Sequence, residues 1–462
     1  MTLSELIDQI LKETPEGFDY EWLGDFVRRI DWQGLQWLQA LPTADNPEDY
    51  GRNIISLEPF ELVLLHWPPG VESAVHLHNG FWGYVLCLEG TVENVAFDLS
   101  KEGQLSKNAV VQAQAGGILP EPDGTIHLIR NGSQNERLVT LHFYSPALDN
   151  LDGLKLYDLA TGTIKICNEQ ATSASLDLTP SCYKEIEHGA FQFMAHEHGD
   201  SHELIPILPK PESDEISRLI RAYYNEQAST YDSHDARHSK RKKYTHGINC
   251  LIAEGLKSIH KEDGLKRVLH VACGTGRRAL EIQELTGINY AKHGFDMSPE
   301  MVEIAESRGL VVTSGHLLEN TPPQPGGYDA ITFLYAYGHL SDSQERFAAL
   351  KRLHQWLRPG GRLYFDAFNI DNPYEWGHQA KALHETYQMG KQGYEAGDVF
   401  YRRKGGESMA FLHYSSLDAL MDILNTIGFD TLRIEHVGYS KQSGELVSEG
   451  GNLFLEVQKS HH

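Results

Sequence analysis

Hydrophobic and polar positions follow three different patterns along this chain, and each pattern predicts a different kind of structure. Apolar residues recur at helical spacing over residues 3–11 and again over residues 23–30, which predicts two short amphipathic helices. From residue 60 to about residue 166 the sequence changes to short apolar or alternating runs separated by Gly, Pro and Asn, which is typical of antiparallel strands. From residue 214 onward, helical patterns alternate with short apolar runs.

These patterns divide the 462 residues into two domains joined by a linker. Residues 1–167 are expected to form an all-β barrel or jelly roll with N-terminal helices, because short strands recur there with turn residues between them. Residues 214–462 have the alternation of a doubly wound, Rossmann-like α/β sheet. Ser, Thr and Pro cluster between the two, so we interpret residues 168–213 as the linker.

Composition and charge exclude several classes of function. The formal net charge of -24 repels nucleic acids and anionic membranes, so we expect neither as a partner. Five scattered cysteines without a CxxC pair favour reduced thiols in the cytoplasm. The first residues lack the apolar core of a secretory signal, and no stretch is long and apolar enough to span a bilayer. We therefore expect a soluble cytoplasmic protein.

Two polar clusters fall outside this framework, and we give each the simpler interpretation. The histidine-rich piece at residues 196–202 offers potential metal ligands, but we expect a solvated loop there. The basic run at residues 237–243 lies in a helical segment and is expected to be a solvated helix face.

A pair of histidines in the first domain points to a metal. His76 and His78 are two apart in a segment with strand character, so both imidazoles project from the same face. His127 and His142 lie on two further predicted strands and offer inward candidates. Three neutral imidazoles would leave a ferrous ion its full charge and open positions, which suits a thiolate binding beside dioxygen. Zinc is the chemical alternative, because imidazole suits it as well.

Over roughly residues 45–165 the chain resembles the cysteine dioxygenase family, a group of cupin thiol dioxygenases. Four segments carry the resemblance: Tyr50-Gly51-Arg52-Asn53, His76-Leu77-His78 followed by Gly90, Ile126-His127-Leu128-Ile129-Arg130-Asn131, and Thr140-Leu141-His142-Phe143-Tyr144-Ser145-Pro146. The resemblance implies a cupin barrel that oxidises a small thiol, in that family cysteine, to the sulfinate with dioxygen.

The resemblance also implies roles for single residues. The ferrous ion would be held by three ligands: His76, His78 and His127. Arg52 would clamp the substrate carboxylate, for which its planar fork of donors is suited. Tyr144 would contact bound thiol and oxygen, held by His142, which Thr140 orients. The Ser145–Pro146 bond is expected to be cis, as the family motif implies.

Several residues depart from the family pattern, and these departures bear on the identity of the thiol substrate. Gly83 stands where many animal members carry a cysteine crosslinked to the tyrosine, so we expect no thioether here. Thr140 replaces the usual serine and keeps the hydroxyl. Phe81 and Trp82 are bulky and change the pocket, which leaves the thiol dioxygenase class better supported than cysteine itself. A second substrate, 3-mercaptopropionate, stays open, although Arg52 favours cysteine.

The second domain begins with a strand that runs into a glycine-containing turn. Residues 268–272 form an apolar run apart from His270, Cys273-Gly274-Thr275-Gly276 follows, and residues 277–285 read as a helix. Small residues at such a turn let a ligand approach the backbone near the unpaired N–H groups of the helix. Asp296 ends the next strand, where a carboxylate can accept hydrogen bonds from a ribose diol. The same pattern also serves dinucleotides.

Neighbouring motifs distinguish between the nucleoside cofactors that such a turn can bind. Residues 220–370 resemble the class I S-adenosylmethionine-dependent methyltransferase family through residues 273–276, 295–301, 328–331 and 357–363. The resemblance implies that Asp296 holds the ribose, that Met297 packs on the adenine, and that Tyr231 belongs to a covering helix. The methionine and ribose part would be flanked by three small residues: Ala272, Gly274 and Gly276. The methyl acceptor would bind near three residues after the fourth strand: Tyr335, Tyr337 and His339.

Two substitutions depart from the methyltransferase pattern. His270 replaces the acid of the first motif, and His316 lies where an aspartate usually follows the third strand. Both changes are expected to weaken cofactor binding, so an inactive or reshaped domain is an alternative. The preferred interpretation is a bifunctional enzyme whose two halves serve one pathway and whose methyl acceptor is a small molecule, for instance the sulfinate. The rival interpretation is a methyltransferase regulated by a non-catalytic, ligand-sensing cupin.

Overall fold

The computed structural model describes residues 1–43, 49–194, 202–233, 239–403, 406, 408–439 and 442–460. The chain forms two compact units. The N-terminal unit comprises Met1–Pro211 with Glu385–Tyr394, and the C-terminal unit comprises Glu212–His384 with Glu395–His462. The stretch expected to be a linker, residues 168–213, carries strands that belong to the N-terminal unit.

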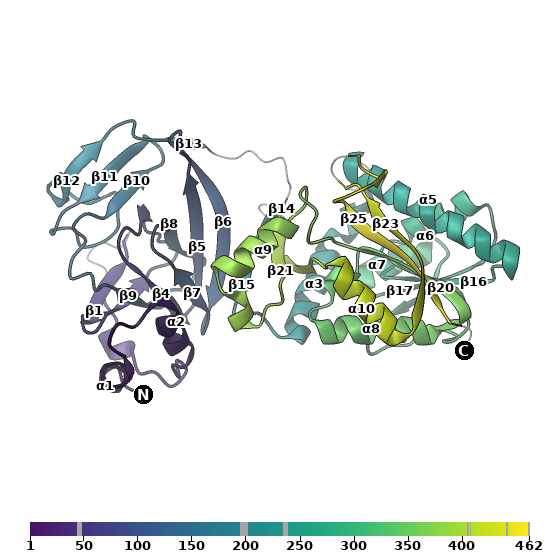
Figure 1. Cartoon of the computed structure of the whole chain (residues 1–462), viewed down its shortest axis with the longest axis horizontal. Helices are drawn as coiled ribbons and strands as arrows, with labels where there is room; N and C mark the ends of the chain where they lie inside the picture. The colour runs from purple at the N-terminus through teal and green to yellow at the C-terminus, as the bar shows by residue number, and fades with distance from the viewer. Residues whose placement is uncertain are drawn as a thin grey trace. The chain divides into compact units, whose positions relative to one another are not determined.

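Two sheets build the N-terminal unit. The first runs in spatial order β1 (Gly51–Ser56), β2 (Glu61–Trp67), β9 (Leu138–Ser145), β4 (Trp82–Glu89) and β7 (Ile118–Glu121). The second runs β12 (Tyr183–Glu187), β11 (Thr163–Cys167), β10 (Lys155–Asp158), β3 (Val75–Leu77), β8 (Ile126–Asn131), β5 (Thr91–Leu99), β6 (Gln104–Gln114) and β13 (Gln192–Met194), with β15 (Ile207–Leu208) also beside β6. A further short strand is β14 (His202–Leu204). The sheets curl (Figure 1), and closure into a barrel stays a prediction.

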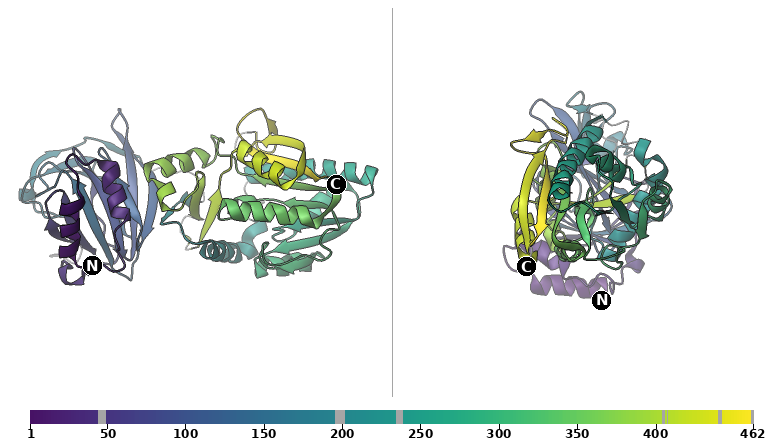
Figure 2. Two further views of the ribbon diagram at one scale, coloured as in Figure 1. Left: turned by 60° about the horizontal axis from the view of Figure 1, so that its bottom comes forward. Right: turned by 90° about the vertical axis from the view of Figure 1, so that its right-hand side faces the viewer.

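The two predicted N-terminal helices are confirmed as α1 (Leu3–Glu13) and α2 (Tyr20–Arg28). Thr2 and Glu5 form a reciprocal capping box at the start of α1, which satisfies two N–H groups that the helix leaves unpaired. Figure 2 shows both helices, in purple, against the strands of this unit. Their apolar faces bury Leu6 and Phe26 with side chains of β2, β4 and β9, which forms the unit's core on that side of the first sheet. The short 3-10 helices of this unit are η1 (Leu38–Ala40), η2 (Pro180–Cys182) and η5 (Met389–Gln392).

The C-terminal unit contains the predicted doubly wound sheet. Its spatial order is β18 (Val311–Ser314), β17 (Ala291–Asp296), β16 (Arg267–Val271), β19 (Tyr328–Phe333), β20 (Leu357–Ala367), β25 (Asn452–Lys459), β23 (Phe429–Val437) and β24 (Leu446–Val447). Neighbouring pairs from β18 to β20 are parallel, whereas β25, β23 and β24 add antiparallel pairs. The strand order reverses between β16 and β19, which is where such sheets bind ligands. A hairpin of β21 (Asp398–Arg403) and β22 (Met409–His413) lies outside this sheet.

Helices cover both faces of this sheet (Figure 1). One face packs against α5 (Ser239–Glu262) and α6 (Arg277–Thr286), and the other against α8 (Ser343–Trp356) and α10 (Leu417–Ile427). The other helices of this half are α3 (Ser213–Gln227), η3 (Ala228–Thr230), α7 (Pro299–Ser307), η4 (Tyr337–His339) and α9 (Gly377–Thr386). Among the helices in the described ranges, none is long and apolar enough to cross a membrane.

Candidate functional sites

Three imidazoles from two paired strands converge in the N-terminal unit. His76 lies on β3, His78 directly follows that strand, and His127 lies opposite His76 on the neighbouring β8. The ring centroid of His127 is 4.6 Å from that of His76 and 4.7 Å from that of His78. One nitrogen from each ring lies within 4.8 Å of the other two. The structure thus brings together the three residues that the sequence places around a metal.

Hydrogen bonds determine which nitrogen of two of these rings carries a proton. His76 donates from Nδ1 to the Ala74 carbonyl at 2.9 Å, and His127 donates from Nδ1 to the Asn94 side-chain oxygen at 3.0 Å. A carbonyl oxygen only accepts, so Nε2 of both rings carries a lone pair. Nε2 of His127 lies 3.1 Å from Nε2 of His78. Both Nε2 atoms can bind one cation when the His78 proton sits on Nδ1, which has no hydrogen-bond partner among the described residues.

Burial keeps the three rings neutral. It lowers the pKa of His76 to about 4 and lowers the pKa of His78 and His127 well below the ordinary value. Because only a neutral imidazole binds a metal, these rings can act as ligands at neutral pH without first losing a proton. The donor set therefore fits a divalent metal that accepts imidazole, as both iron and zinc do.

A directed chain of hydrogen bonds leads to the histidine cluster from the first sheet. Trp67 donates from Nε1 to the Thr140 hydroxyl at 2.9 Å, and that hydroxyl lies 2.8 Å from Nε2 of His142. Nδ1 of His142 lies 2.8 Å from the Tyr144 hydroxyl, which donates to Glu121 at 2.8 Å. Because the phenol O–H donates its hydrogen bond to the carboxylate, His142 donates from Nδ1 to the phenol oxygen, and its Nε2 accepts from the Thr140 hydroxyl. The ring is neutral because burial lowers its pKa to about 3.

Glu121 is a candidate that the sequence analysis missed. Its side chain is fully buried at the end of β7, and burial raises the pKa of its carboxyl to about 8. Its Oε1 lies 3.6 Å from Nδ1 of His127, and its Oε2 lies 3.8 Å from Nε2 of His78. Within the described part of the chain, Oε1 has no hydrogen-bond partner. The available signal was an acidic residue that ends the otherwise apolar run 118–120.

Arg52 already has a carboxylate partner within the fold. Its Nη2 on β1 is ion-paired with Glu61 of β2, and it also contacts the Leu148 carbonyl at 3.4 Å. The Glu61 side chain is fully buried, and its other oxygen accepts the Leu148 N–H at 3.1 Å. Burial raises the pKa of Glu61, and the charge of Arg52 is the main effect that lowers it. The arginine expected to bind substrate is therefore engaged by the protein itself.

Close packing explains the glycine at position 83. The pairing of β4 with β9 places Gly83 opposite Tyr144. A Cβ atom there would lie 2.0 Å from the Phe143 carbonyl oxygen and 2.5 Å from the Tyr144 ring. A cysteine would push the two strands apart, so the glycine suits a tyrosine without a crosslink. The Ser145–Pro146 bond is cis, as expected.

In the C-terminal unit, a tight turn joins β16 to α6. Ala272, Gly274 and Gly276 have positive φ angles of 52°, 53° and 77°, so the chain reverses sharply before the helix begins. Asp296 ends β17 beside this turn. Its Oδ2 accepts the Gly274 N–H at 2.8 Å, and its Oδ1 accepts the Ser298 N–H at 2.9 Å. These bonds hold the carboxylate against the turn at the carboxyl edge of the sheet.

An open cavity of about 890 Å³ lies at this edge. Its walls include most of the predicted cofactor residues: Tyr231, Ala272, Gly274, Asp296 and Met297. Gly276 lies outside the lining of this cavity and is the residue that caps the N-terminus of α6. Of the predicted acceptor residues, Tyr335 and His339 line the cavity, whereas Tyr337 is buried in the core of the sheet. His316 also lines this cavity.

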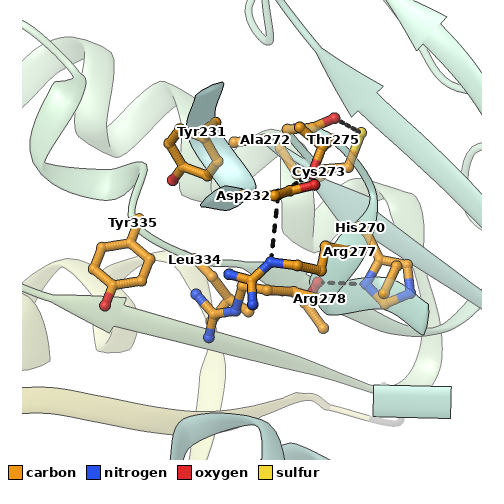
Figure 3. Close-up of a pocket in the computed structure, with 14 residues that line it drawn as sticks. Tyr231, Asp232, His270, Ala272, Cys273, Thr275, Arg277, Arg278, Leu334 and Tyr335 are labelled. Carbon is orange, nitrogen blue, oxygen red and sulfur yellow. Dashed lines mark hydrogen bonds and ion pairs between the residues drawn. The ribbon is translucent and has the colours of Figure 1, made fainter. Parts of the chain in front are cut away.

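A second cavity of about 540 Å³ adjoins the first, because both are lined by Ala272 and Tyr335. Figure 3 shows His270 and Arg278 among its lining residues. Nδ1 of His270 lies 2.9 Å from the hydroxyl of Thr332, while its Nε2 has no hydrogen-bond partner among the described residues. The replacement of the motif acid by His270 therefore leaves a neutral ring here, since burial lowers the pKa of His270 to about 3.

Arg278 gives this second cavity a positive charge, which the sequence analysis did not foresee. Its Nε donates to the Asn249 side chain at 3.0 Å, and its guanidinium lies 5.1 Å from the Tyr335 ring centroid. Both Nη atoms are buried and have no hydrogen-bond partner in the described part of the chain. Burial raises the pKa of Asp366, and the charge of Arg278 is the main effect that lowers it. The two Nη atoms of Arg278 remain able to donate to an anionic group in the cavity.

The two polar clusters of the sequence are described only in part. Residues 195–201 of the histidine-rich piece lie outside the described residues, and only His202 is placed, on β14. Residues 237 and 238 of the basic run also lie outside them. From Ser239 the run is helical, and Lys240, Lys242 and Lys243 are exposed at the start of α5, as a solvated face requires.

Family models match both halves of the chain. Residues 41–157 match cysteine dioxygenase type I, and residues 268–361 match the methyltransferase domain. The first match includes the histidine cluster, the hydrogen-bond chain and Glu121. The second includes the glycine-containing turn, Asp296 and Tyr335.

Curated relatives match the C-terminal half. The ubiquinone/menaquinone biosynthesis C-methyltransferase of Geobacter sp. (strain M21) is 28% identical over 180 residues, which cover 37% of this chain and 73% of that protein. The corresponding enzyme of Geotalea daltonii is 32% identical over 110 residues, covering 22% and 46%. Human methyltransferase-like protein 27 is 37% identical over 99 residues, covering 20% and 37%. The match thus spans less than half the length of the last two relatives.

Solved structures of methyltransferases are also similar. An S-adenosylmethionine-dependent methyltransferase of Methanosarcina mazei has 17% identity and a TM-score of 0.36, covering 43% of this chain and 94% of that one. The 1,6-didemethyltoxoflavin-N1-methyltransferase of Burkholderia thailandensis, with bound S-adenosylhomocysteine, has 15% identity and a TM-score of 0.36, covering 54% and 91%. The family models thus identify a region similar to cysteine dioxygenase type I at residues 41–157 and a region similar to the methyltransferase domain at residues 268–361.

Proposed function

We propose that this chain is a bifunctional enzyme. Its N-terminal domain oxidises a small thiol to the sulfinate with both atoms of dioxygen at a mononuclear ferrous site. Its C-terminal domain transfers a methyl group from S-adenosylmethionine to a small molecule. The observation that carries the oxygenase is the convergence of three neutral imidazoles, and the transferase is supported by Asp296 and the glycine-containing turn beside an open cavity.

The metal would be held by His76, His78 and His127, and the tautomers of His76 and His127 leave the Nε2 lone pairs of these two rings free for it. When bound, iron supplies the redox chemistry that joins dioxygen to sulfur, and three imidazoles leave it positions for both reactants. The overall change, a thiol plus one dioxygen giving a sulfinate and a proton, balances without an external reductant. The protein therefore needs no second redox cofactor for this step.

The chain's own residues manage the proton and the geometry. A thiol loses its proton when it binds as thiolate, and the unpartnered Oε1 of Glu121 is a buried base beside the histidines that can take it. Tyr144 fixes the other oxygen of that carboxylate by donating to it. His142 and Thr140 in turn hold the phenol in this orientation. Their role is to position Tyr144, because they act on it through these hydrogen bonds.

In the transferase, Asp296 would accept hydrogen bonds from the ribose diol, while Ala272 and Gly274 let the cofactor approach the backbone. Met297 and Tyr231 would pack against its flat and apolar parts. Methyl transfer needs alignment more than acid–base chemistry, because the sulfonium carries its own leaving group. The cavity wall supplies that alignment.

Arg278 is proposed to bind the carboxylate of the cofactor's methionine. We expect the substitution Arg278→Gln to weaken binding of S-adenosylhomocysteine about tenfold or more, since charge-assisted hydrogen bonds contribute about 1.5–3 kcal/mol. Binding of 5′-methylthioadenosine, which lacks the carboxylate, should not change. Calorimetric titration of both nucleosides measures the difference. Arg433→Gln, which removes a cation paired with Glu254 on the surface, is the matched control; equal loss for both nucleosides would count against the assignment.

Metal content and oxygen uptake test the oxygenase. The chain is purified without oxygen, its metals are quantified, and oxygen consumption is followed with a panel of thiols. We expect iron and an uptake that depends on the thiol. Zinc or no metal, with no oxygen uptake, would instead support a ligand-sensing domain that regulates the transferase.

A further inference from the structure

Given the proposed dioxygenase, on which this step rests, we propose that its thiol substrate carries an amine and no carboxylate, which makes it a small aminothiol. Two features of the histidine cluster and its surroundings support this class: the partner of Arg52 and the free oxygen of Glu121. Each concerns this chain's own side chains and holds whichever divalent metal binds.

The place for a substrate carboxylate is already filled. Glu61 forms the ion pair with Arg52, and its second oxygen accepts the Leu148 N–H at 3.1 Å. Its side chain is 0% exposed. A substrate carboxylate that took over Arg52 would leave Glu61 charged and buried without its cation, which costs several kcal/mol. The fold therefore opposes carboxylate binding at the position where the family motif predicts it.

Glu121 offers a place for an amine instead. Its Oε1 is buried, lies 3.6 Å from the ring of His127, and lacks a hydrogen-bond partner among the described residues. An amine beside the thiol would donate to this oxygen as the sulfur reaches the metal. A substrate carboxylate has no proton to donate to this oxygen. Tyr144 donates to the other oxygen of Glu121 and so leaves Oε1 without a donor.

Both features oppose a carboxylate and favour an amine. Cysteine, with both an amine and a carboxylate, should fall between the two extremes.

Anaerobic binding of three thiols to the iron-loaded full chain tests the proposal. The probes are 2-aminoethanethiol, cysteine and 3-mercaptopropionate, which carry an amine, both groups, and a carboxylate. Calorimetry without oxygen measures binding separately from turnover. We expect 2-aminoethanethiol to bind at least about tenfold more tightly than 3-mercaptopropionate, with cysteine between them.

Two isosteric variants separate the two carboxylates. Glu121→Gln should weaken 2-aminoethanethiol about tenfold and leave 3-mercaptopropionate unchanged or tighter. Glu61→Gln frees the charge of Arg52 and should tighten 3-mercaptopropionate about tenfold. Glu89→Gln is the control, because Glu89 pairs with Arg137 at the surface of the same domain. Circular dichroism verifies that each variant is folded, and the wild-type order tests the proposal without any variant.

The possible results separate failure of the aminothiol proposal from failure of the proposed dioxygenase function. If the wild type binds 3-mercaptopropionate as tightly as 2-aminoethanethiol, or more tightly, the aminothiol proposal is overturned even if the thiols are oxidised. A Glu121→Gln chain that binds all three thiols as the wild type does also overturns it. If no thiol binds and no oxygen is consumed, the dioxygenase and the aminothiol fall together.

Discussion

Replacing His127 with alanine should remove iron from the N-terminal domain and abolish thiol-dependent oxygen uptake. His127 is buried and contributes one of three nitrogens to the cluster, and its tautomer is fixed by Asn94. Loss of a supporting residue alone typically lowers metal affinity about 10–100-fold, so loss of a ligand should exceed that range. Metal analysis after anaerobic loading and an oxygen electrode give the two readouts.

The matched control for this variant is His66→Gln. His66 lies on β2, bonds the Pro42 carbonyl at 3.1 Å, and is not part of the cluster. We expect this control to retain both iron and oxygen uptake. Binding of S-adenosylhomocysteine should be unchanged in both variants, because His127 belongs to the other compact unit. A His127→Ala chain that keeps its iron would show that the metal is held elsewhere.

Replacing Asp296 with asparagine should weaken binding of S-adenosylhomocysteine about a hundredfold. The carboxylate is proposed to accept two ribose hydroxyls, and hydrogen bonds to a charged group contribute about 1.5–3 kcal/mol each. An amide keeps one acceptor oxygen but loses the charge, and it also disturbs the bond that Asp296 Oδ2 accepts from the Gly274 N–H. Isothermal titration with the purified full chain measures the change.

Asp371→Asn serves as the control for that measurement. Asp371 is an exposed carboxylate of the same unit, paired with Lys381 at the surface, so its loss should leave nucleoside binding intact. Thermal melting of both variants separates a lost ligand contact from a lost fold. Unchanged affinity in a folded Asp296→Asn chain would place the ribose elsewhere.

Local patterns predict the elements better than they predict how the elements assemble. The helical spacing at residues 3–11 and the apolar runs of the second half both became the expected elements, because those patterns reflect burial on one face. The sequence did not predict that β25 and β23 pair antiparallel. No local pattern distinguishes an antiparallel strand added to the sheet from a further parallel strand. The return of Glu385–Tyr394 to the N-terminal unit was equally invisible, because it depends on contacts far apart in sequence.

The residues of the candidate sites divide in the same way, into those that a local motif predicts and those that only the folded structure reveals. The spacing of His76 and His78 and the motif around His127 were enough to predict that these residues come together. Glu121 and Glu61 were missed because a single acidic residue in a strand has no signature until its burial and partners are known. Arg278 was missed for a similar reason, since its unpartnered guanidinium becomes visible only in the cavity.

The most direct test of the central claim is the mass of the product formed under isotopically labelled dioxygen. The iron-loaded chain is incubated with a thiol in ordinary water, and no reductant is added. Three imidazoles around one ferrous ion predict a sulfinate that carries two labelled oxygen atoms. A disulfide, or a sulfinate whose oxygen came from water, would contradict that chemistry.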